Sequence, residues 1–335
     1  MKYQRLATND YSGIMVFAEQ KKDEIHPVTY ELLGKGRELA DCLGVQLSSV
    51  VLGCRTKQEA QELIYCGADK VYWYDHPVFE DLNLLNYKHN IVRLVREVRP
   101  EIFLLGATHW GRSLGARIAV ALETGLTADC TDLRIDQDGS LVQIRPAFSG
   151  SVLAHIKTKA RPQMATVRYK VMHRRRDAGR RGEIIRQEAE LVPSLLTVTK
   201  TERLGQVNIA EAAVIVSGGS GLKKAADFSL LADLAELLGG VVGSSRPPVD
   251  SGWMGREHQV GFSGHTVKPK IYIACGISGS PQHLAGMRQS DVIIAINSDP
   301  SAPIFKLADY GIVGNLYEVI PELMAKVKTR RQSSW

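Results

Sequence analysis

The stretch from Lys270 to Asn297 constrains the fold of this chain more than any other part of the sequence. It contains two short apolar runs, Ile271–Ala274 and Val292–Ile296, which are typical of strands buried on both faces. Gly276 and Gly279 lie between these runs and allow a tight turn in which the backbone can approach a ligand closely. The pattern predicts a strand, a turn, a helix and a second strand, and therefore a parallel α/β sheet.

The helix within this stretch begins where ligands bind in such sheets. Ser280 and Pro281 have the residue types preferred at a helix N-cap and at the first helical position. Ligands of open α/β sheets lie outside the carboxyl ends of the strands, and free N–H groups at a helix start favour anions. His283 follows in the first turn, and the second strand ends on Asn297. The motif is compatible with a nucleotide or phosphate site and also with a tight turn that binds nothing.

Length and composition indicate an ordinary globular protein with two domains. The chain has 335 residues, of which 44% are hydrophobic and 23% charged. No apolar run approaches the roughly 20 residues that cross a membrane, so we expect no membrane insertion. The first residues have neither a signal-peptide core nor an amphipathic transit pattern, so we expect a cytoplasmic protein.

Cysteine and histidine spacing argues against metal centres. The five cysteines form no CxxC pair, and their odd number argues against a disulfide framework. An iron–sulfur cluster needs clustered thiolates, and the nine histidines show no HExxH or mixed His/Cys spacing. We therefore predict no metal.

The net charge of +6 owes much to one basic run, residues 173–181, HRRRDAGRR. Such a run can contact nucleic acid. It contains no aromatic residues and accompanies no recognition-helix or RNA-binding motif, so we predict no nucleic-acid binding. A solvated linker or a surface for an acidic protein partner remains as an interpretation.

Apolar periodicity in the first half predicts alternating strands and helices. We expect strands at residues 14–18, 47–52, 70–74 and 102–106, and helices at residues 28–43, 57–66, 86–98 and 112–122. After Cys130 the pattern predicts a hairpin from residues 133–136 and 141–145 around Gln137-Asp138-Gly139-Ser140. Further strands are expected at residues 152–158 and 164–171, followed by an inter-domain connection over residues 172–194.

The second half returns to the α/β pattern and contains four loops of similar character. We expect strands at residues 213–216 and 308–313, and helices at residues 228–238 and 316–327, beside the stretch described above. The four loops, residues 218–221, 243–246, 259–264 and 276–283, each combine Gly or Ser with one functional side chain. None fits the GxGxxG or GxxxxGK[ST] pattern. Together they suggest one extended nucleotide-like ligand.

Several segments of the chain resemble the electron-transfer flavoprotein α subunit. They are SGGSGLK (217–223), VGSSRPPVDSGW (242–253), HQVGFSGHTVKPKIYIACGISGSPQHLAGM (258–287), VIIAINSDPSAPIF (292–305) and ADYGIVGNLYEVIPEL (308–323). The similarity continues in the first half through GATHWGRSLGARIA (106–119) and GLTADC (125–130). It spans nearly the whole chain, and the IYIACGISG, QHLAG and AIN segments are highly specific for this family.

The resemblance implies a heterodimer of α and β subunits in which the α subunit holds FAD in its C-terminal domain and exchanges electrons with an acyl-CoA dehydrogenase. Arg246 would lie by the isoalloxazine ring. The residues that would also line the flavin are Ser245, Gln259, Val260, Gly261, Ser263 and His283, with Ser220 and Phe262 in adjoining loops. The ribityl and pyrophosphate region would be lined by Ser278, Gly279, Ser280, Pro281 and Gln282, and the adenosine end held by Asn297, Asn315 and Leu316.

Elementary electrostatics agrees with these roles. Reduced flavin carries negative charge, so a nearby cation raises its reduction potential. Arg246 keeps its charge at any working pH. His283 could donate to a flavin carbonyl or add charge if protonated, and Ser263 offers a hydroxyl group. We expect these three residues to tune the flavin without covalent catalysis.

Three positions depart from the commoner family pattern. Ser220 replaces a frequent arginine, and Pro281 replaces a branched aliphatic residue. The loop Gly261-Phe262-Ser263-Gly264-His265 stands where many relatives have a version with Gln, Thr and Lys. These changes bear on the flavin potential more than on flavin binding, and they resemble the anaerobic bacterial branch. Members of that branch can bifurcate electrons from NADH between a low-potential acceptor, ferredoxin or flavodoxin, and the FAD of the α subunit.

The sequence therefore predicts an α/β protein with two domains, each a mainly parallel sheet flanked by helices. Residues 1–171 would form a scaffold for the heterodimer, residues 172–194 a basic linker, and residues 195–335 a Rossmann-like FAD-binding domain. The chain would be an electron carrier subunit rather than a stand-alone enzyme. Two alternatives remain, a stand-alone FAD- or NAD-dependent oxidoreductase and a non-catalytic nucleotide-binding scaffold.

Overall fold

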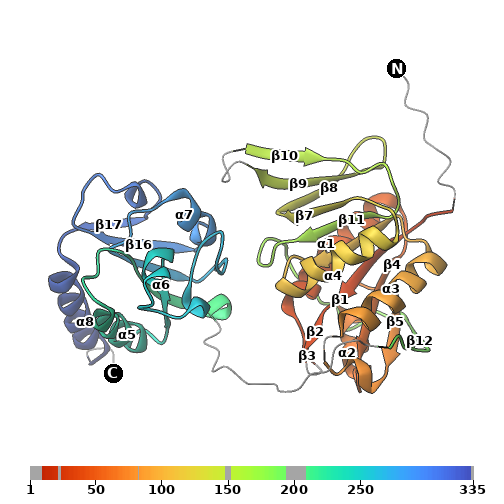
Figure 1. Cartoon of the computed structure of the whole chain (residues 1–335), viewed down its shortest axis with the longest axis horizontal. Coiled ribbons are helices and arrows are strands. Elements are labelled where there is room, and N and C mark those ends of the chain that lie inside the picture. Colours follow the sequence, from red (N-terminus) through yellow and green to blue (C-terminus); the bar gives the residue numbers. More distant parts are fainter. Residues whose placement is uncertain (1–9, 22–23, 82, 148–151, 194–208, 333–335) are drawn as a thin grey trace. The chain divides into compact units, whose positions relative to one another are not determined.

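The computed structural model describes residues 10–21, 24–81, 83–147, 152–193 and 209–332. The chain divides into two compact units, Met1–Val198 and Thr199–Trp335. Figure 1 shows that each unit has its own sheet and its own helices. The boundary falls within residues 194–208, as does the predicted start of the second domain at residue 195, and both lie outside the described residues. Each unit is described below by itself.

Unit 1 is built on a seven-stranded parallel sheet of order β12-β5-β4-β1-β6-β11-β7. Its strands are β1 (Ile14–Ala18), β4 (Leu47–Gly53), β5 (Lys70–Asp75), β6 (Ile102–Gly106), β7 (Leu126–Cys130), β11 (Gln163–Val167) and β12 (Glu183–Gln187). Every residue of β1, β4, β6 and β11 is buried, as expected for parallel strands covered on both faces. The strands predicted in the first half are confirmed, with small shifts in their ends.

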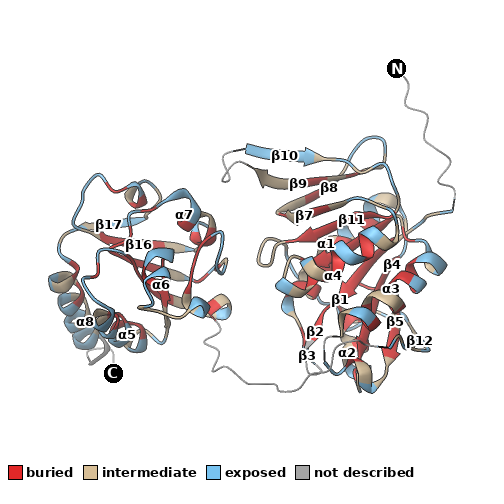
Figure 2. Ribbon diagram, viewed as in Figure 1, coloured by how far each residue is buried: buried red, intermediate tan, exposed pale blue. Residues whose placement is uncertain are grey.

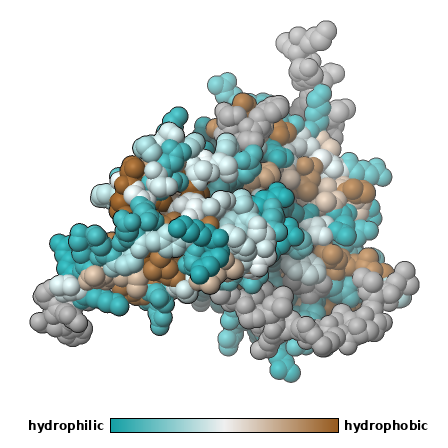
Figure 3. Space-filling view, turned by 60° about the vertical axis from the view of Figure 1, so that its left-hand side comes forward, coloured by the Kyte–Doolittle hydropathy of each residue, from teal (hydrophilic) through white to brown (hydrophobic). Residues whose placement is uncertain are grey.

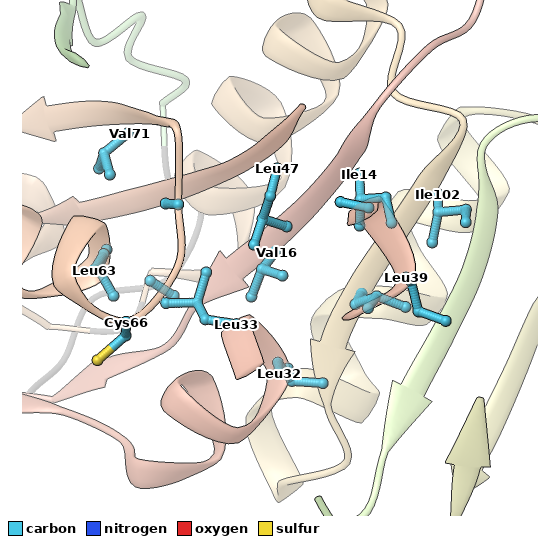
Figure 4. Packing of buried hydrophobic residues seen from close by; sticks show 14 of the residues in the cluster. Ile14, Val16, Leu32, Leu33, Leu39, Leu47, Leu63, Cys66, Val71 and Ile102 are labelled. Atoms are coloured by element: carbon cyan, nitrogen blue, oxygen red, sulfur yellow. The ribbon is translucent and has the colours of Figure 1, made fainter. Parts of the chain in front are cut away.

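Helices cover both faces of this sheet. They are α1 (Pro27–Leu43), α2 (Lys57–Tyr65), α3 (Leu84–Val98) and α4 (His109–Ala121), with a 3-10 turn at Pro77–Phe79. Leu32 and Leu33 of α1 pack with Leu63 of α2 against Ile14 and Val16 on one face (Figure 4). α3 and α4 supply the core of the opposite face, and Figure 2 shows buried strands between helices with exposed outer surfaces. The predicted helices are confirmed.

Two small antiparallel sheets complete unit 1. β8 (Asp132–Ile135) and β9 (Leu141–Ala147) form the predicted hairpin, and β10 (Val152–Ile156) pairs with β9 to make three strands. β2 (Gln20–Lys21) and β3 (Glu24–Ile25) form a short pair that the sequence analysis did not predict. Gly139 has a left-handed backbone with φ 76°, which explains the Asp-Gly turn of the hairpin.

The interpretation of residues 172–194 as a linker is wrong, because this segment belongs to unit 1. β12 pairs in parallel with β5 and forms the edge of the large sheet. The basic run before β12 is held by acidic partners. Arg176 pairs with Glu62 at 2.6 Å, and the guanidinium of Arg180 pairs with the carboxylate of Asp69 at 2.5 Å. Since these two arginines are paired within unit 1, the exposed run lies across the surface of this unit as a strap and does not connect the two units.

Unit 2 contains a five-stranded parallel sheet of order β14-β13-β15-β16-β17. Its strands are β13 (Val214–Gly218), β14 (Val241–Ser244), β15 (Ile271–Cys275), β16 (Val292–Asn297) and β17 (Tyr310–Val313). The strand–helix–strand prediction for residues 270–297 is confirmed, because α7 (Pro281–Met287) connects β15 and β16, which pair in parallel from Ile271 and Val292. Both domains are therefore α/β, as predicted.

The helices of unit 2 also cover both faces of the sheet. α5 (Phe228–Leu237) and α8 (Leu316–Gln332) pack on one face, while α7 and residues around Ile304 pack on the other. α6 (Arg246–Asp250) is a short helix after β14, and the 3-10 turns lie at Ile209–Glu211, Ala225–Asp227, Arg256–His258 and Pro303–Lys306. On the face that Figure 3 shows, hydrophobic residues form separate groups among hydrophilic ones.

The strand order of unit 2 fixes where a ligand can enter. The chain runs from β13 to β14 on one side and then to β15 on the other side of β13. The connections after β13 and β15 therefore leave the sheet in opposite directions, and a crevice opens between the carboxyl ends of these strands. Unit 1 has a corresponding point between β1 and β6, because β4 and β6 flank β1.

Candidate cofactor-binding site

A cavity of about 830 Å³ opens at the carboxyl ends of the strands of unit 2. Its volume falls within the range of typical small-molecule and cofactor sites, about 300–1,000 Å³. The predicted residues that line it are Ser220, Ser245, Arg246, Gln259, Val260, Gly261, Phe262, Ser263, Ser278, Ser280, Gln282, His283 and Asn297. The four loops singled out in the sequence thus meet around one space.

Other lining residues were not among the predicted site residues. They are Gly221, Pro247, Asp250, Ser251, Gly276, Ile277, Asp299 and Ala302. Gly221, Gly276 and Ile277 lie within the predicted loops and Pro247 directly follows one of them, so the position of each loop at a strand end was the signal that could have identified these four. Asp250 and Asp299 are different, because their carboxylates bring negative charge to a cavity for which we had predicted only a cation.

Four predicted residues do not line the cavity. Gly279 adopts φ 88°, and a Cβ there would lie 2.5 Å from the backbone nitrogen of Ile304, so glycine is required by packing. Pro281 is the first residue of α7. Asn315 donates from Nδ2 to Glu318 at 3.0 Å, and Leu316 is 6% exposed within the core beside α5. The structure places the last two in the start of α8.

Glycines let the two central loops meet backbone to backbone. The N–H of Gly219 donates to the Cys275 carbonyl at 3.0 Å, and the N–H of Gly221 donates to the Gly276 carbonyl at 2.9 Å. A Cβ at Gly219 would lie 2.4 Å from the Gly276 oxygen. Gly276 itself has φ 61°, a conformation that favours glycine. These positions fix the floor of the crevice without side chains that would fill it.

Hydrogen bonds hold the loop over residues 259–265 against the start of α7. Gln259 donates from Nε2 to the Ser263 hydroxyl at 3.0 Å, and the N–H of Phe262 donates to the Gln282 carbonyl at 2.7 Å. The Phe262 residue is nevertheless 66% exposed. The loop therefore presents an aromatic ring on a fixed backbone at the cavity.

Arg246 is the first residue of α6 and lies beside a carboxylate. Its Nε is 3.0 Å from Asp250 Oδ2, with side-chain exposures of 67% and 61%. An exposed pair of this kind contributes at most about 1 kcal/mol, because water screens it. The guanidinium can therefore exchange this partner for a ligand at little cost.

His283 lies in the cavity wall. The sequence suggested that its ring could donate to a ligand or carry a charge, and the structure shows a different arrangement. Its Nε2 is 3.0 Å from the Tyr272 hydroxyl and its Nδ1 is 3.0 Å from the Val260 carbonyl oxygen. Burial lowers the pKa of His283 to about 4, and the contact with Val260 offsets part of this effect. The ring is therefore neutral near pH 7, and both of its nitrogens have protein partners.

Asn297 connects the loops that follow β15 and β16. Its Nδ2 donates to the Ile277 carbonyl at 3.0 Å, and its Oδ1 accepts from the N–H of Asp299 at 3.0 Å. Ser280 caps α7 by accepting from the N–H of His283. Polar groups at this side of the cavity thus hold the loops in place and face the same space.

Other kinds of site are not found among the described residues. In that part of the chain no group of three or more His, Cys, Asp or Glu residues could hold a metal ion. No described helix is both long enough and apolar enough to span a bilayer. Cys275 is fully buried on β15, and burial raises the pKa of its thiol to about 12, so it is a core residue.

The donor set fits a dinucleotide cofactor. Serine hydroxyls at positions 220, 245 and 278 lie at three strand ends, where phosphate and sugar oxygens of nucleotides bind in this class of sheet. One guanidinium and the backbone of a glycine-rich crevice accompany them. The fold and the cavity define an α/β protein with a nucleotide-type cofactor pocket in its second unit.

Comparison with known proteins identifies the family. Residues 14–192 match the family model of the electron transfer flavoprotein domain, and residues 208–288 match that of the electron transfer flavoprotein FAD-binding domain. The chain therefore belongs to the electron transfer flavoprotein α-subunit family. The second match contains most of the residues that line the cavity.

Relatives of known name support this assignment over nearly the full length. The electron transfer flavoprotein subunit alpha of Thermoanaerobacterium thermosaccharolyticum is 49% identical over 96% of this chain and 99% of its own. The subunit alpha of Megasphaera elsdenii is 46% identical over 96% and 98%. The lactate dehydrogenase (NAD(+),ferredoxin) subunit LctC of Acetobacterium woodii is 42% identical over 95% of this chain and 77% of its own.

Proposed function

We propose that this chain binds one FAD in the cavity of unit 2 and carries electrons as the α subunit of an electron-transfer flavoprotein. One observation carries the proposal. The cavity is lined by the four predicted loops and lies in the unit that matches an FAD-binding domain. When bound, FAD supplies one-electron and two-electron redox chemistry. The residues of the chain bind and orient it.

The proposed roles follow from the chemistry of each side chain. Arg246 would face the isoalloxazine ring, where its charge favours reduced flavin. Ser263 is oriented by Gln259 and would offer its hydroxyl to the flavin. The loop around Ser278 and Ser280 would hold the ribityl chain and pyrophosphate, and Asn297 would hold the adenosine end. Gly279 and Pro281 would shape this loop without direct contacts.

Asn315 and Leu316 are less suited to contact the cofactor than the other predicted residues. Neither lines the cavity, and both are engaged at the start of α8. We propose that they position the turn between β17 and α8 rather than contact the adenosine directly. Ser220 and Phe262 do line the cavity and would set how this flavin differs from that of other family members.

We further propose a complex with an electron-transfer flavoprotein β subunit and electron exchange with an acyl-CoA dehydrogenase. The relative LctC bears the name of a subunit of a dehydrogenase that uses NAD(+) and ferredoxin. This likeness supports a bifurcating complex in which NADH is the donor and ferredoxin or flavodoxin the low-potential acceptor. The cytoplasmic location expected from the sequence stays a prediction.

Anaerobic stepwise reduction of the chain purified with its β partner tests this proposal. One flavin per heterodimer, with AMP as second nucleotide, indicates a simple electron shuttle. Two flavins, one of high potential and one reduced by NADH, indicate bifurcation. A preparation that stays colourless after incubation with FAD supports the non-catalytic scaffold instead, and substrate turnover by the isolated chain supports a stand-alone oxidoreductase.

A further inference from the structure

Phe262 holds an apolar ring in water at the cavity of unit 2. The residue is 66% exposed, whereas Val260, two positions earlier in the same loop, is 1% exposed. A single exposed apolar side chain is common on protein surfaces, so its place is what distinguishes this one. Of the large hydrophobic residues that are exposed in the described part of the chain, Phe262 is the one that lines the cavity.

The backbone beneath Phe262 is held from two sides. Its own N–H donates to the Gln282 carbonyl at 2.7 Å, at the start of α7. The N–H of Val260 donates to the Ser244 carbonyl at 2.9 Å, at the end of β14. The loop is therefore fixed between a strand end and a helix start, and only the side chain of Phe262 extends into water.

Two glycines shape the turn that carries the ring. Gly261 has φ 146°, and a Cβ there would lie 3.1 Å from the Gln282 oxygen. A Cβ at Gly264 would lie 2.3 Å from the Gln259 oxygen, and the N–H of Gly264 donates to the Gly261 carbonyl at 3.1 Å. The turn is too tightly packed to reorient, so the ring of Phe262 stays directed away from the core of the unit.

The position of the loop along the sheet shows which end of the cavity has the ring. The loop bonds to Ser244 at the end of β14, and Arg246 begins α6 directly after that strand. Asn297 ends β16, and two strands, β13 and β15, lie between β14 and β16. Neighbouring strands are about 4.8 Å apart, so these two strand ends are roughly 14 Å apart. Arg246 and Phe262 therefore share one end of an elongated cavity, and Asn297 lies at the other.

We infer that Phe262 covers the isoalloxazine ring of bound FAD and is itself buried when the cofactor binds. The inference deepens the proposed function and rests on it. FAD has a flat aromatic ring system at each end, and either can contact a phenyl ring. The isoalloxazine ring gains negative charge on reduction, so the end that contains the guanidinium of Arg246 favours it. A phenyl ring at this end also excludes water from the flavin.

Titration of the full chain, freed of flavin, with FAD tests this inference in Phe262→Ala. Loss of the aromatic contact should weaken FAD binding about tenfold. Tyr310→Ala is the matched control and should bind FAD as the wild type does, because Tyr310 is 64% exposed on β17 and does not line the cavity. Without FAD, both variants should unfold at the wild-type temperature, since neither ring belongs to the core clusters of unit 2.

Phe262→Trp identifies the part of the cofactor that the side chain contacts. An indole ring in contact with an isoalloxazine ring quenches flavin fluorescence by electron transfer, and an indole ring on the distant adenine does not. The fluorescence lifetime of FAD bound to Phe262→Trp should therefore be shorter than that of FAD bound to the wild type. Tyr310→Trp should keep the wild-type lifetime.

The outcomes separate this inference from the proposed function. A wild-type chain that binds no FAD contradicts the proposed function, and the inference with it. If the wild type binds FAD and Phe262→Ala binds it equally well, the inference alone is overturned, and slower electron transfer to a partner protein would then assign the ring to that partner. Weaker binding by Phe262→Ala with an unchanged lifetime in Phe262→Trp places the ring at the adenine and also overturns the inference.

Discussion

The two parallel sheets share one crossover, in which the first strand lies between the strand of the same sheet that follows it in the chain and a later one, yet this point is built in opposite ways in the two units. In unit 2 the loops after β13 and β15 contain glycines that touch backbone to backbone, and the crevice above them opens into the cavity. In unit 1 the corresponding strands, β1 and β6, are followed by Glu19 and Thr108. The Thr108 hydroxyl donates to Glu19 Oε2 at 2.6 Å, across the crevice.

The start of α1 completes the closure in unit 1. The Glu19 carbonyl accepts from the N–H of His26, and its N–H donates to the Thr29 hydroxyl. A Cβ at Gly106 would lie 2.6 Å from Val28, so this helix packs against the end of β6. Thr108 also caps α4 by accepting from Gly111. The Glu19 carboxylate thus occupies the place beside a helix start where a ligand phosphate binds in other sheets.

The comparison shows that strand order provides a binding position but the residues after the strands decide whether it is used. A substitution that fills the crevice of unit 2 should therefore have the largest effect. Gly219→Ala would place a Cβ 2.4 Å from the Gly276 oxygen. We expect a loss of stability of about 1–3 kcal/mol and at least tenfold weaker FAD retention.

Thermal unfolding and flavin absorbance after gel filtration measure these two effects. Gly115→Ala in α4 is the control, because a Cβ there meets its nearest neighbour, Thr166, at an ordinary 3.4 Å. If Gly219→Ala retained FAD as the control does, close backbone approach would not be what keeps this site open.

Substitution of Arg246 tests the second difference between the units. The cavity of unit 2 is lined by a positive charge, whereas the corresponding point of unit 1 holds the carboxylate of Glu19. A unit charge at about 4 Å contributes roughly 4 kcal/mol at an effective dielectric of 20, and solvent reduces this for an exposed side chain. We expect Arg246→Ala to lower the flavin reduction potential by on the order of 100 mV, since 59 mV corresponds to about 1.4 kcal/mol for one electron.

Spectroelectrochemical titration of the heterodimer with bound FAD measures this potential. Asp250→Asn removes the carboxylate 3.0 Å from Arg246 and should raise the potential by a smaller amount. An unchanged potential in Arg246→Ala would remove this residue from the vicinity of the ring.

The buried carboxylate of unit 1 should give its stability a pH dependence. Burial raises the pKa of Glu19 from 4.5 to about 6, and the bond from Thr108 offsets part of that effect. Between these pH values the folded chain keeps a proton that the unfolded chain releases. Glu19 should therefore make stability fall as pH rises from 4.5 to 6, by about 2 kcal/mol from this group.

Urea unfolding at several pH values detects this slope. Glu19→Gln should reduce the slope, because glutamine can still accept from Thr108 and does not titrate. Part of the slope should remain, since burial also raises the pKa of Glu31 to about 7. The exposed Glu80 provides the control, and Glu80→Gln should keep the wild-type slope. Equal slopes in all three proteins would show that Glu19 is not the titrating group.

The smallest effect is expected at Asn297, which we proposed to hold the adenosine end of the cofactor. Asn297→Ala removes two hydrogen bonds that join the loops after β15 and β16. A hydrogen bond contributes a net free energy of about 1 kcal/mol beyond the bonds that water would make in its place. FAD should therefore bind roughly five- to tenfold more weakly, with its reduction potential unchanged. Fluorescence titration with FAD measures the affinity. Asn315→Ala should have less effect, and the reverse order would exchange the roles of the two asparagines.

The sequence predicted much of the fold because its signals are local. Apolar periodicity identified the helices α1 to α5 and α8 and most strands of the two large sheets, but it did not identify β7, β12 or β14. The Gly- and Ser-containing loops of unit 2 were identified by composition, and they meet at the cavity. Arg246 was recognisable from the loop 243–246, which combines Gly and Ser with one functional side chain, and from the family resemblance. Apart from the resemblance, these predictions need only the identity and spacing of residues near one another in the chain.

The remaining features depend on contacts between distant residues. Nothing near the basic run indicates that Glu62 and Asp69 would match its charges, so the run resembled a linker. The orientation of the His283 ring depends on Tyr272, eleven residues earlier on another element. Asp250 is visible in the sequence, but its ion pair with Arg246 emerges only when α6 forms.

The strap formed by residues 173–181 also has a consequence for synthesis of the chain. The Arg176–Glu62 pair spans 114 residues of sequence, and β12 cannot pair with β5 until the strap has crossed the unit. Long-range closures of this kind slow folding. During translation the backbone N–H and C=O groups at the edge of β5 remain unpaired until β12 leaves the ribosome, and they can pair with a strand of another chain. A nascent chain that stalls before residue 187 would therefore be prone to aggregate, although the buried core residues of unit 1 have already been synthesised.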